Sequence, residues 1–573
     1  MTRNKYMKLA AAVTALLLTV TALTACGSAS AKSSASSSAS ASASTETAAM
    51  ESKFGGLFLT ADDINIKDSD SYSEDWKSGD YTEITKATTI KEEGVYVVSG
   101  KISGQITVEA ADDAKVQIVL NGAAITSDDG PAIYIKSGDK ITISLPEGTE
   151  NILTASKVST DDDVDGAIYS KADLVLNGTG SLKVTSSADG IHSTDDLRIT
   201  GGTYAITASD DGLVGKDRLE IADGDFVIKA GAKGLKTTNE EDEDKGFLYI
   251  EGGTFDINAG DDGINVKTAA WITGGTLTIK SGDDGIHADE TLTIDDGKID
   301  VTESVEGLEA PEIVLNGGDI EVNSSDDGIN AAGGQTADSS TQNGQSTDGQ
   351  AQDQDSKTES ENSAQAVAMA ATTGDGSGQQ FQGQPPEGEM PNGEKPSGEM
   401  PNGKPGGWQG GHGGGGMHGG MGGFDNENSQ GYLTINGGTI YINAEGDGLD
   451  ANTEITQTGG DVVVEGPTKS GNGALDYGKS YNMTGGTLFA VGSSGMMQGI
   501  SEGSKVPSLA ARLNGSIGKG DTLTIKDSSG KEVFSYKLSK SIESVVYASA
   551  DLSSGSSYSI LNGSSEVGTA NVN

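Results

Sequence analysis

The chain has 573 residues, a formal net charge of −47 and a single cysteine. A chain this acidic does not bind nucleic acid by neutralising phosphates, and one cysteine cannot form a disulfide within the chain. Self-repulsion of this size is commonly offset by bound cations, for which extracellular calcium is the first candidate.

The N-terminus indicates export and lipid anchoring. Three basic residues precede an apolar run from Leu9 to Leu23, which is too short and too closely followed by small residues for a membrane span. The run ends in Leu-Thr-Ala-Cys, which resembles the bacterial lipobox and implies cleavage of a signal peptide and lipidation of the Cys26 sulfur. An ordinary secretory signal with an incidental cysteine is the alternative. The Ser/Ala-rich stretch that follows is typical of a flexible tether.

A repeated motif dominates the chain from Ser186 to Asp450, with the pattern S-x-D-D-G-I followed by L-x-I-x-G-G-T-x-x-I. The glycines that close its first turn, from Gly190 to Gly328, lie 22, 22, 29, 22, 22 and 21 residues apart, a spacing typical of a solenoid. Apolar and polar residues alternate over short runs between glycines, as they do in β-strands, and no unit carries helical spacing. A unit of about 22 residues accommodates three short strands and three turns, which predicts an all-β fold, a parallel β-helix.

Alternation along each strand assigns the core, because successive side chains point to opposite faces. Two inward columns begin at Leu182 and Val184, and a further wall begins at the pair Leu197 and Ile199. The strand edges at both ends of such a stack require caps. The predicted segments are the signal peptide 1–25, the tether 26–53, N-terminal cap strands 54–118, a first β-helix part 119–332, an insert 333–430, a second β-helix part 431–500 and a C-terminal cap 501–573.

The insert interrupts one coil of the repeat. Its first part is polar and its second part is rich in Gly, Met and Pro, so neither can bury a core and we expect disorder. The repeat resumes in register after it, which makes the insert a loop rather than a domain boundary. His412 and His418 stand there beside methionines, a set that could bind a soft metal, although a glycine-rich spacer is the simpler interpretation.

Acidic residues recur immediately before the turn glycines. Carboxylates stacked about 4.8 Å apart raise one another's pKa unless a cation or backbone amides intervene, and calcium prefers carboxylate and amide oxygens. The alternative is turn chemistry, in which each carboxylate accepts backbone amides at its corner. Lys233 replaces Asp in one coil, which predicts a salt bridge that interrupts the ladder. The predicted calcium ligands are Asp210, Asp211, Asp261, Asp262, Asn265, Asp283, Asp284, Asp326, Asp327 and Asn330.

Aromatic residues supply the candidate carbohydrate site. Alignment of the repeats places Tyr249 and Trp271 in adjacent coils of one outward column, as an exposed pair of the kind that stacks on sugar rings. Tyr441 points outward from another face, and we predict that all three contact polysaccharide. In the alternative interpretation, the rings shield backbone or pack under the insertion at residues 239–245.

Three features together resemble a known family: the segment 84–156, which begins ITKATTIKEEGVYVVSG, the run of D-G-I and G-G-T repeats, and the ending VVYASADLSSGSSYSI. They are similar to the β-helix carbohydrate-binding lipoproteins of Gram-positive anaerobes, over most of residues 85–560 outside the insert. The resemblance implies a right-handed β-helix of polysaccharide-lyase shape. It also implies binding of calcium and of plant cell-wall glycans such as cellulose and polygalacturonate, with no demonstrated catalysis.

We therefore expect a monomeric lipoprotein on the extracellular face of the cytoplasmic membrane that binds polysaccharide with calcium and is not an enzyme. A pectate-lyase-type enzyme is one alternative. It needs a strong base beside calcium, commonly an arginine, and Arg198 and Arg218 project outward at non-equivalent positions of neighbouring coils. A surface adhesin or scaffold that binds a protein partner is the other alternative.

Overall fold

The computed structural model describes residues 53, 56–61, 63, 64, 66, 75–159, 164–335 and 429–573. The predicted signal peptide, Cys26, nearly all of the tether and nearly all of the insert lie outside these residues. The chain divides into two compact units, of which the smaller, residues 340–421, also lies outside them. In the described part of the larger unit, no helix is long and apolar enough to cross a membrane.

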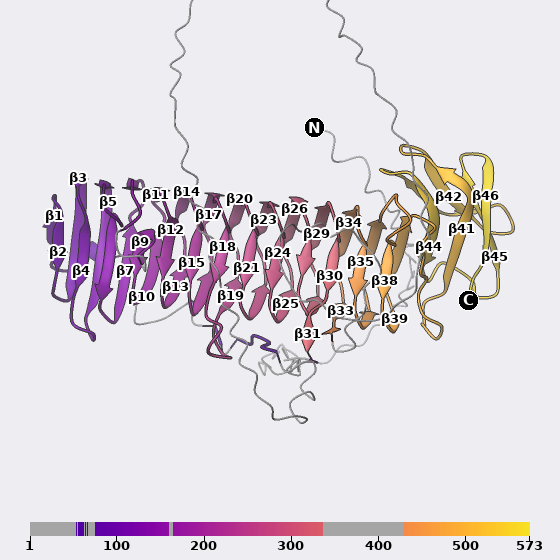
Figure 1. Ribbon diagram of the computed structural model, residues 1–573, viewed down its shortest axis with the longest axis horizontal. Helices are drawn as coiled ribbons and strands as arrows, with labels where there is room; N and C mark the ends of the chain where they lie inside the picture. The colour runs from indigo at the N-terminus through magenta and orange to yellow at the C-terminus, as the bar shows by residue number, and fades with distance from the viewer. Residues whose placement is uncertain are drawn as a thin grey trace, which may run out of the picture. The chain divides into compact units, whose positions relative to one another are not determined.

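Most of the larger unit consists of two long, mainly parallel sheets, of 27 and 13 strands (Figure 1). The 13-stranded sheet takes one short strand from each coil: β2 (Thr88–Ile90), β4 (Ile106–Glu109), β6 (Ile133–Ser137), β9 (Gly166–Ser170), β12 (Asp189–Ser193), β15 (Leu213–Gly215), β18 (Leu235–Thr237), β21 (Ile264–Val266), β24 (Ile286–Ala288), β27 (Leu308–Glu309), β30 (Ile329–Ala331), β35 (Leu449–Ala451) and β38 (Leu475–Tyr477).

The 27-stranded sheet forms the other two walls of each coil. Its first row contains β1 (Thr82–Ile84), β3 (Gly94–Ser103), β5 (Lys115–Ser127), β7 (Lys140–Leu145), β10 (Asp173–Gly178), β13 (Asp196–Ile199), β16 (Arg218–Ile221), β19 (Phe247–Ile250), β22 (Ala269–Ile272), β25 (Thr291–Ile294), β28 (Glu312–Leu315), β33 (Tyr432–Ile435), β36 (Glu454–Gln457) and β39 (Ser480–Met483). Its second row contains β8 (Glu150–Ala155), β11 (Ser181–Ser186), β14 (Thr203–Ala208), β17 (Asp225–Lys229), β20 (Thr254–Asn258), β23 (Thr276–Lys280), β26 (Lys298–Ser304), β29 (Asp319–Ser324), β34 (Thr439–Ala444), β37 (Asp461–Glu465) and β40 (Thr487–Gly492).

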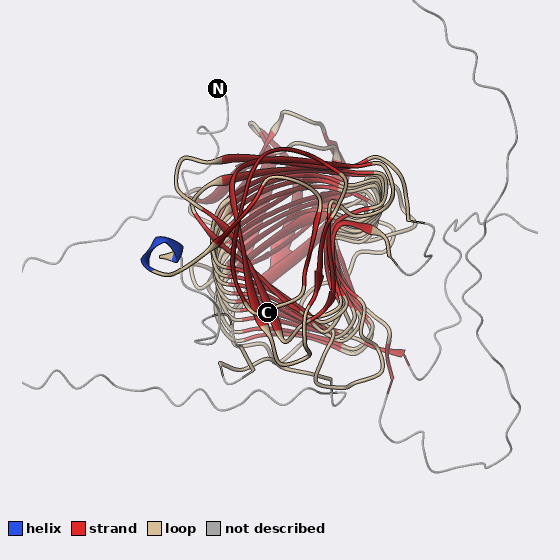
Figure 2. Cartoon of the chain, turned by 90° about the vertical axis from the view of Figure 1, so that its left-hand side faces the viewer, coloured by secondary structure: helices blue, strands red, loops and turns tan. Residues whose placement is uncertain are grey.

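The strand register confirms the inward columns expected from the repeat. Leu182 pairs with Tyr204, Tyr204 with Phe226 and Phe226 with Phe255. The three rings are buried and stack with centroids 4.9 and 4.7 Å apart. Figure 2 looks along the stack and shows the strands around a common interior. This all-β, solenoid-like arrangement is consistent with the expected β-helix, and right-handed winding stays a prediction.

Two kinds of glycine shape each coil, for different reasons. At Gly190 and its equivalents, an added Cβ would overlap the carbonyl oxygen of the next coil's glycine, so close approach of the coils excludes any side chain. Gly202 and Gly253, in the Gly-Gly-Thr part of the repeat, have φ values of 109° and 101°. Side chains disfavour that left-handed region, which explains why the repeat keeps glycine there.

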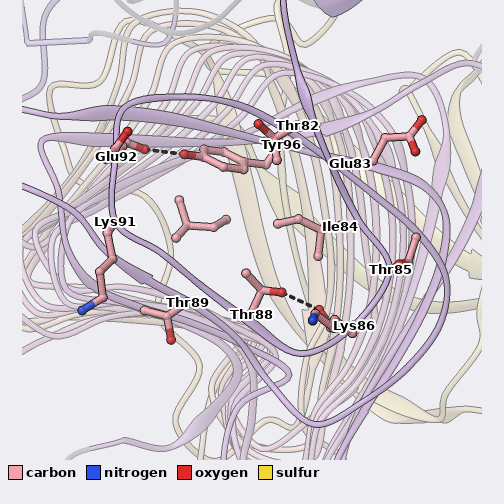
Figure 3. Close-up of a pocket in the computed structure, with 11 residues that line it drawn as sticks. Thr82, Glu83, Ile84, Thr85, Lys86, Thr88, Thr89, Lys91, Glu92 and Tyr96 are labelled. Atoms are coloured by element: carbon pink, nitrogen blue, oxygen red, sulfur yellow. Dashed lines mark hydrogen bonds between the residues drawn. The ribbon is translucent and has the colours of Figure 1, made fainter.

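The first coil leaves a pocket at the end of the stack. Strands β1 and β2 pair on one side only, with β3 and β4, in the described residues. The pocket has a volume of about 500 Å³ and is lined by these strands, the turn between them and Tyr96 (Figure 3). Its walls combine acidic, basic and hydroxyl side chains, and Tyr96 donates its hydroxyl hydrogen to the carbonyl of Glu92 at 2.9 Å. Because β1 to β4 pair within the two long parallel sheets, the strands of the predicted N-terminal cap belong to the same sheets as the later coils.

An N-terminal strap, the described residues between 53 and 66, runs outside the first row of strands. The amide of Leu57 donates to Glu290 Oε2 at 2.7 Å, and Thr291 Oγ1 donates to the carbonyl of Leu57 at 2.5 Å. Arg218 donates to the carbonyl of Asp63 at 3.4 Å. The strap thus contacts the coil of β25 near its start and the coil of β16 near its end. Farther along the chain, the one-turn helix η1 (Trp76–Ser78) places Trp76 against Val97 and Val119.

The C-terminal part is antiparallel. Strand β44 (Ile542–Ala548) pairs with β40 and with β41 (Ser508–Ile517). A four-stranded sheet follows the order β43 (Glu532–Lys537), β42 (Thr522–Lys526), β45 (Ser557–Asn562) and β46 (Ser565–Asn571). These strands form a second apolar cluster that includes Phe489 of the last coil. The C-terminal strands therefore cover the last coil of the parallel stack.

The two ends of the insert meet in the structure. Strand β31 (Gly334–Gln335) pairs antiparallel with β32 (Ser429–Gln430). Replacing residues 336–428 with an Asn-Gly turn is therefore expected to leave the melting temperature unchanged or slightly higher, because closing a shorter loop costs less entropy. Thermal unfolding followed by circular dichroism checks this, and a clearly lower melting temperature would show that the insert packs on the solenoid.

Candidate metal-binding ladder

The residue before each turn glycine forms a column beside the 13-stranded sheet, which we call the acidic ladder. A second column lies three residues later, on the outward face of the sheet, and its register follows from the strand pairs. The ladder positions are Asp189, Asp211, Lys233, Asp262, Asp284, Glu306, Asp327 and Asp447, and the outward positions are His192, Val214, Lys236, Asn265, His287, Glu309, Asn330, Asp450 and Asp476.

Turn chemistry occupies one oxygen of several ladder carboxylates. Asp189 Oδ1 accepts the amide N–H of Asp211 at 2.9 Å, and Asp211 Oδ1 accepts that of Lys233 at 2.8 Å. In later coils, Asp327 Oδ1 accepts the amide N–H of Asp447 at 2.6 Å. Each of these carboxylates therefore links its coil to the next through the backbone, as the alternative to calcium predicted. What the ladder can bind therefore depends on the second oxygen of each carboxylate.

Basic side chains neutralise the upstream half of the ladder, from Asp189 to Asp284. Lys236 Nζ lies 2.8 Å from Asp211 Oδ2. Lys233 Nζ contacts Asp261 and lies 3.4 Å from Asp262 Oδ2, so the salt bridge predicted for Lys233 is confirmed.

The other predicted ligands of the upstream half lie close to one another. Asn265 donates to Asp262 Oδ2 at 2.7 Å. Asp261, Asp262 and Asp283 bring their oxygens together, and Asp210 joins Asp211 and Asp189 in the same way.

His287 is a further basic group of the upstream half, and carboxylates surround it. Its Nδ1 lies 2.6 Å from Glu309 Oε2 and its Nε2 lies 3.0 Å from Asp289 Oδ1. Burial lowers the pKa of His287, but hydrogen bonds to Asp284, Asp289 and Glu309 outweigh it and raise the pKa to about 12. His287 is therefore an imidazolium held by carboxylates, and Asp284 faces this cation rather than Asp283.

The downstream half consists of Glu306, Asp326, Asp327, Asn330, Asp447 and Asp450. Burial and then neighbouring carboxylates raise the pKa of Asp450 to about 8 and that of Asp447 to about 6. Burial likewise raises the pKa of Glu306 and of Asp327 to about 7. In the described part of the chain, no basic side chain is among the groups that shift these four pKa values. The downstream carboxyls are therefore harder to ionise than ordinary carboxyls, and no basic side chain of the described residues offsets their charge when they do ionise.

Asn330 completes the downstream half. Its Nδ2 donates to Glu306 Oε2 at 2.8 Å, while its Oδ1 is buried and accepts no hydrogen bond in the structure. Asn330 pairs in register with Asp450. Asp326 and Asp327 approach one backbone position of the next coil, Gly446, where an added Cβ would overlap an oxygen of each.

Asp476 extends the outward column and was not predicted. It pairs in register with Asp450. The repeat spacing breaks before it, since the chain reads G-A-L-D-Y where the preceding coil reads D-G-L-D-A. The Leu-Asp pair that the two coils share is the sequence signal from which Asp476 could have been predicted.

The aromatic column is correctly aligned but is not exposed as expected. Register pairs Glu220 with Tyr249 and Tyr249 with Trp271, and the two rings lie 5.3 Å apart. Tyr249 is only 9% exposed, and Trp271 is half-buried with its Nε1 donating to Asp295 at 2.8 Å. The strap contacts β25 and β16, the strands on either side of β22 and β19, which carry the two rings. The expectation of an exposed pair is therefore wrong for Tyr249.

Tyr441 is also covered. It lies half-buried on β34 and donates its hydroxyl hydrogen to Glu465 Oε2 at 2.7 Å. Glu465 Oε1 accepts the amide N–H of Ser539 at 2.6 Å, so the C-terminal part reaches this position. Burial, followed by the charge of Glu465, raises the pKa of Tyr441. The hydroxyl of Tyr441 is therefore engaged within the protein.

Replacing Tyr249 with alanine is expected to lower the free energy of unfolding by about 2–4 kcal/mol, because a buried ring leaves a cavity. Replacing Trp271 with alanine is expected to cost less, since its ring is half-buried. Urea unfolding of both variants measures the difference. Equal, small losses would mean that the strap does not cover Tyr249 in solution.

The family model and a curated relative agree with the sequence resemblance. A solved structure described as a polysaccharide lyase-like protein from C. thermocellum, gadolinium derivative, shares 33% identity with a TM-score of 0.36 and covers 36% of this chain and 87% of that chain. The carbohydrate-binding domain-containing protein of Acetivibrio thermocellus is 32% identical over 154 residues, or 25% of this chain and 54% of the relative. The chain thus spans about half the length of this curated relative. A family model named "Carbohydrate-binding domain-containing protein" matches residues 85–344, 271–377 and 417–569, and because these matches cover more than half of the chain, the chain belongs to that family.

Proposed function

We propose that this protein is a surface lipoprotein that binds acidic cell-wall polysaccharide through calcium held by the downstream half of the acidic ladder. Lipidation at Cys26 and a right-handed β-helix are part of this proposal. Family membership supports a carbohydrate ligand. The observation that carries the calcium assignment is the group of downstream carboxylates with raised pKa values and no basic partner among the described residues.

The donor set of the downstream half fits calcium. All of its side chains offer oxygen, the ligand atom that calcium prefers. Asn330 Oδ1 is buried without a hydrogen bond, and a cation would satisfy it. A divalent ion would also relieve the repulsion between Asp327, Asp447 and Asp450. The upstream half fits less well, because Lys233 and Lys236 already contact its carboxylates.

The same calcium ions bind the polysaccharide. Calcium takes six to eight oxygen ligands, so protein oxygens leave positions for carboxylates of a uronate chain. The coils repeat about every 4.8 Å, which lets several uronates follow several coils. Binding to polygalacturonate is then chelator-sensitive, and binding to a neutral glycan such as cellulose is much less so.

Retention on insoluble polygalacturonate tests this proposal. Asp450→Asn is compared with Asp256→Asn, because Asp256 is an exposed residue of β20 outside the ladder. With calcium, the wild type and Asp256→Asn are expected to be retained, whereas Asp450→Asn is retained at least about tenfold less. Chelator is expected to release all three proteins. Equal retention of the two variants, or chelator-resistant retention of the wild type, would contradict the calcium assignment.

Polysaccharide lyase activity is the second candidate. The described arginines all have partners away from the downstream half: Arg198 contacts Glu220, Arg218 contacts Asp196 and Arg512 contacts the carbonyl of Ser494. Their positions favour binding without catalysis. Release of unsaturated uronides from polygalacturonate, measured by ultraviolet absorbance, would instead establish a lyase. Retention that depends on an added protein and not on glycan would favour an adhesin.

A further inference from the structure

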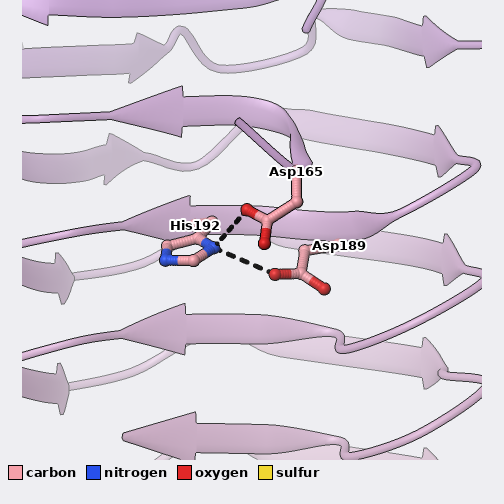
Figure 4. A group of neighbouring side chains, drawn as sticks. All are labelled: Asp165, Asp189 and His192. Carbon is pink, nitrogen blue, oxygen red and sulfur yellow. Dashed lines mark hydrogen bonds and ion pairs between the residues drawn. The ribbon is translucent and has the colours of Figure 1, made fainter. Parts of the chain in front are cut away.

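A different cluster of possible metal ligands lies at the upstream end of the ladder, around His192 (Figure 4). Asp189 and His192 both belong to β12, and Asp165 immediately precedes β9 in the neighbouring coil. The pairing of Gly166 with Asp189 places the two aspartates side by side. The side chains of His192 and Asp189 are 15% and 5% exposed and that of Asp165 is 40% exposed, so the cluster is buried on the side of β12 and reaches solvent at Asp165.

Two carboxylate oxygens share one ring nitrogen at this cluster. His192 Nδ1 lies 2.9 Å from Asp189 Oδ2 and 2.8 Å from Asp165 Oδ1. A ring nitrogen carries at most one hydrogen, and the contact with Asp189 has hydrogen-bond geometry. Asp165 Oδ1 is a buried oxygen that accepts no hydrogen bond in the structure. Three ligand atoms therefore converge on one point, and a single proton leaves one of them unsatisfied.

His287 provides the contrast, since it occupies the equivalent position of a later coil and also has carboxylates around it. There, Nδ1 faces Glu309 at 2.6 Å and Nε2 faces Asp289 at 3.0 Å. Nδ1 also lies 3.3 Å from Asp284 Oδ2, so three carboxylates surround the ring of His287 and both of its nitrogens have an acceptor, which a protonated ring satisfies. The His192 cluster differs because, among the described residues, it has no third carboxylate at Nε2, and both of its carboxylates approach Nδ1.

We propose that Asp165, Asp189 and His192 bind a divalent transition metal of the zinc type. One imidazole nitrogen and two carboxylate oxygens are a donor set that suits zinc, whereas calcium takes oxygen ligands. The site is thus separate in place and in chemistry from the calcium site proposed for the downstream half. Three protein ligands leave a further position for a solvent or ligand oxygen.

Neighbouring groups hold the three ligands in place. Asp189 Oδ1 accepts the amide N–H of Asp211 at 2.9 Å, which fixes the carboxylate and leaves Oδ2 for the metal. The ring of Tyr169 lies 5.0 Å from that of His192, centroid to centroid, and restricts its rotation. Both contacts come from the strand stack itself, so the site requires no large rearrangement.

The test uses the full chain stripped of metal, with His412 and His418 changed to glutamine in every sample so that His192 and His287 are the remaining histidines. Zinc is titrated against a chromophoric chelator, and cobalt(II) replaces zinc to give a visible spectrum. We expect one equivalent of zinc and a cobalt spectrum that changes with ligation. His192→Ala is expected to weaken zinc binding by more than about tenfold, and His287→Ala is expected to leave it unchanged.

The outcomes separate this site from the calcium proposal. Asp165→Asn removes the charge of one ligand with little change in side-chain size, and it is expected to weaken zinc binding while calcium-dependent retention on polygalacturonate persists. Zinc binding that survives His192→Ala and Asp165→Asn in folded protein would overturn the proposal. Loss on His287→Ala instead, or displacement of zinc by millimolar calcium, would overturn it as well. Melting curves of each variant establish that it is folded.

Discussion

Replacing Arg198 with methionine is expected to lower the free energy of unfolding by about 3–5 kcal/mol. Arg198 is 2% exposed, and its Nε donates to Glu220 Oε2 at 2.9 Å. Its other nitrogens contact Asp196 and, at 3.5 Å, Asp173. Glu220 is fully buried, so loss of the guanidinium would leave a buried carboxylate without its charge partner. The sequence predicts that Arg198 projects outward, and the structure places it with Glu220 in a buried ion network on the outer face of the strands.

Two comparison variants identify the cause of that loss. Arg198→Met combined with Glu220→Gln is expected to recover much of the stability, because the second change removes the buried negative charge that the guanidinium had offset. Lys280→Met breaks an ion pair whose side chains are 48% and 65% exposed, and it is expected to cost no more than about 1 kcal/mol. Urea unfolding compares the three proteins. A loss for Arg198→Met as small as that for Lys280→Met would mean that the network contributes no more than a surface pair.

The stack itself was predictable because its determinants are local and repeated. The inward columns require only the period of two along a strand and the spacing of about 22 residues between coils. Leu182, Tyr204 and Phe226 could therefore be aligned without any three-dimensional information. The salt bridge of Lys233 was predictable for the same reason, since it replaces an acidic residue in an aligned column.

The covering of the outward column was not predictable in this way. The strap contacts on either side of the aromatic pair join residues far apart in sequence, such as Leu57 and Glu290 at a separation of 233. The apolar residues of the strap, Leu57 and Ile64 among them, were assigned to cap strands because nothing in the repeat says where they dock. Burial of an outward residue is thus a property of distant segments, whereas register is a property of the repeat.

The division of the acidic ladder into two halves could be predicted only in part from the sequence. The basic residues Lys233, Lys236 and His287 occupy positions of the ladder and of the outward column, so the sequence alone shows that the upstream half contains cations. The orphaned oxygen of Asn330 and the raised pKa of Asp450 depend on how tightly adjacent coils pack, which the sequence does not state. The proposal of calcium at the downstream half therefore rests on packing that only the structure shows.

Without divalent cations, the stability of the protein is expected to fall as the pH rises from about 4 to about 8. Asp450 has a folded-state pKa of about 8, well above the ordinary value of 3.8, and Asp327 is raised to about 7. In this window the folded protein binds more protons than the unfolded chain. The stabilisation from these groups is fully present below the unfolded pKa and is lost as the pH passes through the folded values. A tenfold difference in proton affinity between the folded and unfolded states corresponds to about 1.4 kcal/mol before solvent screening.

Calcium is expected to reverse that loss at pH 8 and to have little effect near pH 4, where protons already neutralise the carboxylates. Calcium at about 100 times its Kd would add about 2.7 kcal/mol if it binds only the folded state. Melting curves at both pH values, with calcium and with chelator, measure this directly. Asp450→Asn should flatten the pH dependence and weaken the calcium response, while Asp256→Asn should retain both. Identical curves with calcium and chelator at pH 8 would show that the downstream carboxylates are stabilised by the protein alone, and calcium would then have no structural role in this ladder.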